Sequence, residues 1–123
     1  MLVENDVALA PRTTLGLGGP ARRFARLTST GELAEALALD PNVMILGGGS
    51  NLVVGDAGFD GLVLEMAIRG VSIGTSIDCE LVSAAAGEVW DDFVARMVEA
   101  GRTGVECLSG IPGLVGATPM QNV

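Results

Sequence analysis

Residues 44–54 read MILGGGSNLVV, with three glycines, a serine and an asparagine between two apolar runs. The apolar run at 43–46 is typical of a short buried strand. Glycine loses more conformational freedom on folding than any other residue, so three in a row need a structural reason. A main chain without side chains can turn successive N–H groups into one concavity that binds an anion such as phosphate. Ser50 and Asn51 would then add donors at its rim. A plain glycine-rich turn between strands is the alternative, and the residues alone leave both interpretations open.

The pattern around this stretch predicts a fold that mixes helices and strands. Ser29 followed by Glu32 is a capping-box pattern, so we expect a helix at 30–39. Apolar residues recur at helical spacing from Trp90 to Val98, which predicts a second helix at 89–100 with Trp90 and Met97 in the core. Four or five strands are expected from the short apolar runs at 24–28, 43–46, 62–66, 71–73 and 81–86.

Composition excludes several functions. The net charge of −8 disfavours non-specific nucleic-acid binding, and no apolar run reaches the ~18 residues of a membrane span. The chain contains no His and no Lys, which excludes a Ser–His pair, a His-ligated metal and a Walker lysine. We predict no metal site.

The acidic N-terminal stretch is unlike a signal peptide, so the expected location is cytoplasmic. Cys79 and Cys107 are expected to be small buried apolar groups, with a reactive thiol as the alternative. The arginines at 22, 23 and 26 are expected to form a solvated rim, with an anion contact as the alternative.

A second glycine-rich loop, Gly110 to Gly113, lies near the end of the chain. It offers the same kind of small, stiff main-chain surface as Gly47 to Gly49. Two such loops in one compact domain suit a diphosphate with a bulky group at each end, and a dinucleotide such as a flavin cofactor has that shape. The usual nucleotide signatures do not fit, because GGGSNL lacks the third glycine of the Rossmann pattern and no helix is expected after it.

Four strings in this order resemble the UDP-N-acetylenolpyruvoylglucosamine reductase (MurB) family: TTLGLGGPARRF (13–24), LGGGSNLVV (46–54), AAAGEVWDDFVARMVEAG (84–101) and GVECLSGIPGLVGATPMQN (104–122). The resemblance implies a flavoenzyme of peptidoglycan precursor synthesis that reduces the enolpyruvyl ether of a UDP-sugar with a hydride passed from NADPH through FAD. It implies an α+β fold, the two-part FAD-binding domain of the vanillyl-alcohol-oxidase (PCMH) type, incomplete at its C-terminus. Residues 1–67 would be the first FAD-binding subdomain and 68–123 the second, with the substrate-binding domain absent.

The resemblance also implies the site residues. The first glycine loop would hold the FAD pyrophosphate through main-chain amides and two side chains, and the second set would line the diphosphate and the flavin. The implied cofactor-binding residues are Gly47, Gly48, Gly49, Ser50, Asn51, Leu52, Gly110, Ile111, Pro112, Gly113, Gly116, Ala117, Thr118, Gln121 and Asn122.

No residue of the chain is predicted to be catalytic. The reaction needs an acid for the second proton and stabilisation of developing charge, and no residue here is an evident candidate for either role. In the family, these groups and the substrate domain come later than Val123. We therefore expect the 123 residues alone to be inactive. We also expect that the protein requires no protein partner. Two alternatives stay open: another flavoprotein of the same superfamily, such as an oxidase, and a non-catalytic module whose glycine loops are structural.

Overall fold

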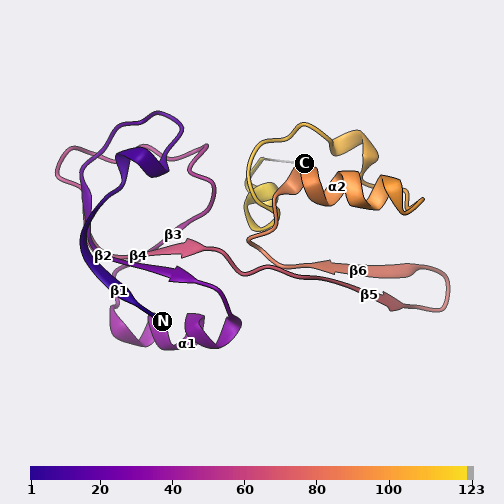
Figure 1. The fold of residues 1–123 in the computed structure, drawn as a ribbon, viewed down its shortest axis with the longest axis horizontal. Helices are drawn as coiled ribbons and strands as arrows, with labels where there is room; N and C mark the ends of the chain where they lie inside the picture. Colours follow the sequence, from indigo (N-terminus) through magenta and orange to yellow (C-terminus); the bar gives the residue numbers. More distant parts are fainter. Residues whose placement is uncertain (122–123) are drawn as a thin grey trace. The chain divides into compact units, whose positions relative to one another are not determined.

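The structure is a computed structural model, and it describes residues 1–121. Contacts divide the chain into two compact units, Met1–Ala67 (unit 1) and Ile68–Val123 (unit 2). Each unit has its own strands and helices, coloured along the chain in Figure 1. The assignment of the two ranges as FAD-binding subdomains stays a prediction.

Unit 1 is built on a four-stranded sheet with the order β1-β2-β4-β3. β1 pairs antiparallel with β2, whereas β2 and β3 both run parallel to β4. The carboxyl ends of the three parallel strands therefore lie at the same edge of the sheet. The strands are β1 (Val3–Ala8), β2 (Pro20–Leu27), β3 (Val43–Leu46) and β4 (Phe59–Met66).

Three of these four strands differ from the sequence prediction. β1 was not expected, because VENDVA is mostly polar; it lies at the edge of the sheet and none of its residues is fully buried. β2 begins four residues earlier than predicted and β4 three residues earlier. The early part of β2 contains Arg22 and Arg23, whose charges are compensated by carboxylates in the folded chain.

The centre of the sheet is buried on both faces. Phe24 and Ala25 of β2 are both buried, as are Val63 and Leu64 of β4. Because successive residues of a strand point to opposite faces, both faces must be covered here. α1 (Thr30–Leu39) packs against β2. A cluster of buried residues forms the core beside the glycine loop: Leu9, Ala21, Phe24, Leu46, Val54 and Val63.

The predicted capping box at the start of α1 is confirmed. Ser29 Oγ accepts a hydrogen bond from Glu32 N–H at 3.3 Å, and the Glu32 carboxylate accepts one from Ser29 N–H at 3.1 Å. Glu32 also accepts from Thr28 N–H at 2.7 Å and from Thr28 Oγ at 2.9 Å. The Thr28 N–H, followed by the Thr28 hydroxyl, lowers the pKa of Glu32 from its ordinary value to about 2.

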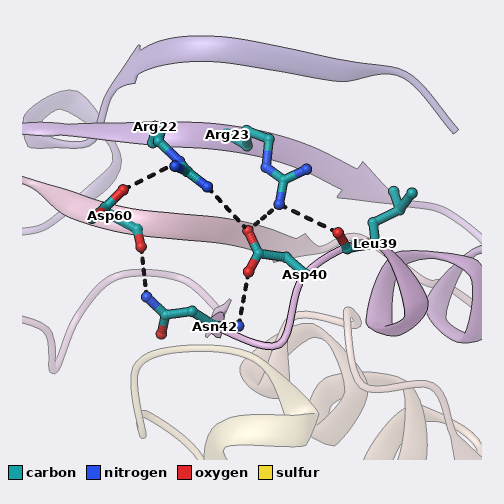
Figure 2. A network of polar contacts seen from close by, with 6 residues as sticks. All are labelled: Arg22, Arg23, Leu39, Asp40, Asn42 and Asp60. Carbon is teal, nitrogen blue, oxygen red and sulfur yellow. Dashed lines mark hydrogen bonds and ion pairs between the residues drawn. The ribbon is translucent and has the colours of Figure 1, made fainter.

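A polar network joins the end of α1 to β2 (Figure 2). Asp40 is the buried C-cap residue of α1, and its carboxylate accepts from Asn42 N–H at 2.9 Å and pairs with Arg23. Arg23 also donates to the carbonyl oxygen of Leu39 at 3.4 Å. The Asn42 N–H, and next the Arg23 guanidinium, lower the pKa of Asp40. The two donors thus compensate an acidic side chain at a helix end that disfavours negative charge.

The same network reaches β4. Arg22 lies 3.2 Å from Asp60 and 3.7 Å from Asp40, and the Asn42 side chain donates to the Asp60 carbonyl oxygen at 2.6 Å. Arg26 pairs with Glu65 at 3.5 Å. The basic cluster that the sequence placed at a solvated rim is therefore held in ion pairs, with Arg22 and Arg26 more than half exposed.

Unit 2 consists of a two-stranded antiparallel hairpin, an α-helix and two 3₁₀ helices. Trp90, Phe93, Val94 and Met97 of α2 form its buried core, as the helical spacing predicted, whereas Val98 is half exposed. Gly101 ends the helix with φ +69°, and Arg102 N–H donates to the Met97 carbonyl oxygen at 2.9 Å. The elements are β5 (Val71–Thr75), β6 (Glu80–Ala84), α2 (Trp90–Glu99), η2 (Glu106–Leu108) and η3 (Val115–Gln121).

Candidate functional site

The glycine loop follows β3 at the sheet edge where the parallel strands end. Leu46, the last residue of β3, is buried, and Leu52 on the far side of the loop packs against the same core. Gly49 has φ +68°, a left-handed conformation that favours glycine. A Cβ atom on Gly49 would lie 2.0 Å from the Arg12 carbonyl oxygen, and the Gly49 carbonyl oxygen accepts from Thr14 N–H at 2.9 Å. One of the three glycines is thus required by close packing against residues 12–14.

The N–H groups of the loop have no acceptors within the part of the chain that the structure describes. None of residues 47–51 donates a hydrogen bond to a main-chain or side-chain oxygen among residues 1–121. Gly48, Ser50 and Asn51 are exposed, and Gly47 is half-buried. Main-chain N–H groups are strong donors that are normally paired, so these are available to an anionic ligand.

A depression of about 400 Å³ lies beside the loop. Gly47 and Gly48 form part of its wall, and Ser50, Asn51 and Leu52 are not among the residues that line it. Further lining residues come from the short 3₁₀ helix η1 (Ala10–Arg12) and the residues after it. The lining residues are Pro11, Arg12, Thr13, Thr14, Gly47, Gly48 and Glu65.

Arg12 is the positively charged residue of this depression, and sequence reasoning did not include it in the site. Its guanidinium lies 2.8 Å from the Glu65 carboxylate and 4.2 Å from the centre of the Phe24 ring. A cation over an aromatic face is attracted to it by the electrostatic quadrupole of the ring. The nearby sequence APRTT carries no recognisable anion-binding pattern, and the link to the glycine loop appears only when Gly49 packs against residue 12.

The second predicted glycine loop, Gly110 to Gly113, is hydrogen-bonded to a carboxylate of the chain itself. Asp91 accepts from Gly110 N–H at 2.7 Å and from Ser109 Oγ at 2.7 Å. The Gly110 N–H, and next the Ser109 hydroxyl, lower the pKa of Asp91. Gly110 and Gly113 are left-handed, at φ +84° and +111°, and Trp90 N–H donates to the Gly113 carbonyl oxygen at 3.0 Å. The N-terminal turn of α2 therefore fixes the conformation of this loop.

The remaining predicted residues of unit 2 also make contacts inside it. Gly116 N–H donates to the Ala86 carbonyl oxygen at 2.9 Å, and a Cβ atom on Gly116 would lie 2.6 Å from that of Ala86. Thr118 is buried, and its hydroxyl donates to the Leu114 carbonyl oxygen at 3.2 Å. Ile111 packs against the core, Pro112 is exposed, and Ala117 and Gln121 belong to η3. Asn122 lies outside the described residues. A cofactor contact by this set stays a prediction.

Two further sequence predictions concern reactive and metal-binding side chains. Cys79 and Cys107 are exposed, which contradicts the prediction that they are buried; Cys79 lies in the bend before β6 and Cys107 in the short 3₁₀ helix η2, and neither position is covered by a core cluster of the described residues. Among residues 1–121, no three His, Cys, Asp or Glu side chains gather closely enough to hold a metal ion. No helix within that range has the length and apolar character needed to cross a membrane.

Comparison with known proteins identifies the family. The family model described as the FAD binding domain matches residues 21–123. The chain belongs to the FAD-binding domain family. This FAD-binding domain begins in β2 and includes the glycine loop of unit 1 and the whole of unit 2. The α+β fold expected from the sequence is confirmed, and FAD is the cofactor of this FAD-binding domain.

Relatives of this FAD-binding domain carry a common name. Proteins named UDP-N-acetylenolpyruvoylglucosamine reductase from Streptomyces coelicolor and Thermobifida fusca are each 52% identical to it, over 97% and 96% of this chain. A third, from Cutibacterium acnes, is 51% identical over 96%. The aligned part covers 31%, 35% and 33% of these relatives, so the chain spans about a third of their length.

The residues of unit 1 fit the anionic part of FAD. Gly47, Gly48 and Arg12 line one depression, the loop N–H groups have no acceptors among residues 1–121, and both N–H and guanidinium donors suit phosphate oxygens. The fit is less direct in unit 2, where the Gly110 N–H is bonded to Asp91.

Proposed function

We propose that this chain is the FAD-binding part of an NADPH-dependent flavoenzyme that reduces UDP-N-acetylglucosamine enolpyruvate to UDP-N-acetylmuramate in peptidoglycan precursor synthesis. The observation that carries the proposal is the identity of about half of all residues, over nearly the whole chain, with reductases named for that substrate. The FAD binding domain match supports it independently.

In this proposal, residues Gly47 to Leu52 form the main contact with the FAD pyrophosphate. Support comes from the loop N–H groups, which have no acceptors among residues 1–121, and from the depression lined by Gly47 and Gly48. Further cofactor contacts are proposed for Gly110 to Gly113, Gly116 to Thr118, Gln121 and Asn122. For Gly110, the proposal requires either that the ligand uses other atoms of the loop or that Asp91 gives up one hydrogen bond.

When bound, FAD supplies the hydride chemistry. The residues of this chain bind and orient the cofactor, and no residue of the chain is proposed to move a proton. The remaining requirements of enolpyruvyl ether reduction are an acid and charge stabilisation at the carboxylate, which the proposal assigns to other parts of the whole protein. We further propose that the protein acts in the cytoplasm on a small-molecule UDP-sugar, without a nucleic acid, a membrane or an obligatory protein partner.

The test uses the whole protein that carries this chain. After purification it should be yellow, with flavin absorbance that remains through gel filtration, and it should oxidise NADPH only when the enolpyruvyl UDP-sugar is present. A colourless protein that takes up no added FAD contradicts the proposal. Turnover of simple alcohols with oxygen, without use of NADPH and the UDP-sugar, would instead assign it as an oxidase.

A further inference from the structure

We propose that Arg12 is a phosphate-binding residue of the FAD site, acting with the main-chain N–H groups of the glycine loop. This inference rests on the proposed function, because it assigns a further residue to the same cofactor. Residue 12 lies before the region matched by the FAD binding domain, which begins at residue 21. Neither the family match nor the sequence motifs therefore point to it.

The position of Arg12 is the first support. Arg12 lines the same depression as Gly47 and Gly48. Two main-chain contacts hold residues 12–14 against the glycine loop. Gly49 packs against the Arg12 carbonyl oxygen, and Thr14 N–H donates to the Gly49 carbonyl oxygen. A group bound by the loop N–H groups therefore lies beside a guanidinium of defined position.

The second support is the number of donors that Arg12 still offers. A guanidinium has five N–H donors. One of its nitrogens, Nη1, donates to Glu65, and no other acceptor is found for the group within residues 1–121. By contrast, Arg102 in unit 2 uses two nitrogens, at 2.7 and 3.3 Å from Glu80. Arg12 is oriented by Phe24 and Glu65 but retains donors for a second anion.

The local charge is the third support. Glu65 is shared, because it pairs with Arg12 at 2.8 Å and with Arg26 at 3.5 Å. Because the Glu65 carboxylate is shared between two guanidiniums, it neutralises Arg12 only in part. Of the residues lining the depression, Arg12 and Glu65 are the charged ones. A phosphate there would meet the positive member of the pair without a second carboxylate opposing it.

The experiment measures binding of FAD and of riboflavin, which lacks phosphate, to the whole protein freed of flavin. Arg12→Leu is expected to raise the Kd for FAD roughly ten- to hundredfold, the range of a charge-assisted hydrogen bond, and to change the Kd for riboflavin less than about twofold. Arg26→Leu is the matched control. It removes a positive charge beside the same Glu65, but Arg26 does not line the depression, so the Kd for FAD is expected to change less than about threefold.

Other results would overturn the inference. They are an unchanged Kd for FAD in Arg12→Leu, an equal loss for FAD and riboflavin, or an equal effect of Arg26→Leu. If Arg12→Leu does not fold, Arg12→Gln decides in the same way, because it retains a polar side chain without the charge. Failure of the wild-type protein to bind FAD would contradict the proposed function itself, whereas wild-type FAD affinity in Arg12→Leu contradicts only the role of Arg12.

Discussion

The Oδ1 atom of Asp91 accepts a hydrogen bond from Gly110 N–H at 2.7 Å and thereby joins the first turn of α2 to the second glycine loop. Ser109 Oγ donates to the same oxygen. The Asp91 carboxylate thus accepts a hydrogen bond from this loop, which the sequence analysis expected to bind the phosphate of a cofactor. Contacts within the chain therefore order the loop. The left-handed conformation of residue 110 is enough to explain why it is a glycine, without a bound ligand.

Replacement of Asp91 by Asn should lower the thermal stability of the protein at pH 7. The folded-state pKa of Asp91 is depressed, so its contribution is present above its unfolded pKa of about 3.9 and is lost as the pH falls through the lower folded-state value. The difference in Tm between wild type and Asp91→Asn should therefore shrink below about pH 4. Asp92→Asn, a neighbouring acid on α2, is the control. A difference in Tm that is the same at pH 7 and pH 3 would contradict this role.

The carboxyl group of Glu32 should titrate with a midpoint near pH 2, which can be followed by its side-chain carbon chemical shift in NMR. The depressed pKa stabilises the folded state above the unfolded pKa of about 4.3, and this stabilisation is lost as the pH falls through about 2. Glu32→Gln should remove it, so that Tm depends less on pH between 2 and 4. Glu35→Gln, on the same helix but outside the capping box, is the control and should retain the wild-type dependence.

Gly49→Ala should lower the free energy of unfolding by at least about 2 kcal/mol, measured by urea unfolding. The new Cβ atom would lie 2.0 Å from the Arg12 carbonyl oxygen, on a main chain with φ +68°. Gly55→Ala is the matched control, because its Cβ atom would have no neighbour within 4 Å and its φ is not left-handed. Equal effects of the two substitutions would show that close packing at residue 49 does not matter.

The 123-residue chain alone is expected to show no NADPH-dependent reduction of the enolpyruvyl UDP-sugar, because no residue in it is an evident proton donor for that reaction. The measurement is NADPH absorbance with FAD and substrate in excess, and the whole protein is the positive control. Reductase activity of the isolated chain would show that it contains a proton donor after all.

The sequence predicted best the features that depend on local pattern. The capping box at Ser29 and Glu32 and the apolar stripe of α2 both involve residues within one or two turns of each other, and both are confirmed. β1 could not be predicted in the same way, because its stability comes from pairing with β2 rather than from its own composition. The early start of β2 has a similar cause, since Arg23 is tolerated there by pairing with Asp40, 17 residues later.

The candidate site was predictable only where it consists of main chain. Glycines at 47–49 mark a loop that needs small residues, and the loop N–H groups have no acceptors among the described residues. Arg12 was missed because its relation to the loop depends on contacts across 37 residues of sequence, between Arg12 and Gly49. The role of Asp91 was missed because an acidic residue in a first helical turn is explained sufficiently by the helix dipole.

The close fit of Gly49 against residue 12 couples two stretches of main chain that border the depression. Residues 12–14 and the loop are held together by van der Waals contact at Gly49 and by a main-chain hydrogen bond, Thr14 N–H to the Gly49 carbonyl oxygen, and neither contact involves a side chain. Exchange of Ser50, Asn51 or Arg12 should therefore alter what is recognised without altering the width of the opening. The region offers a rigid frame in which ligand preference can be re-engineered one side chain at a time.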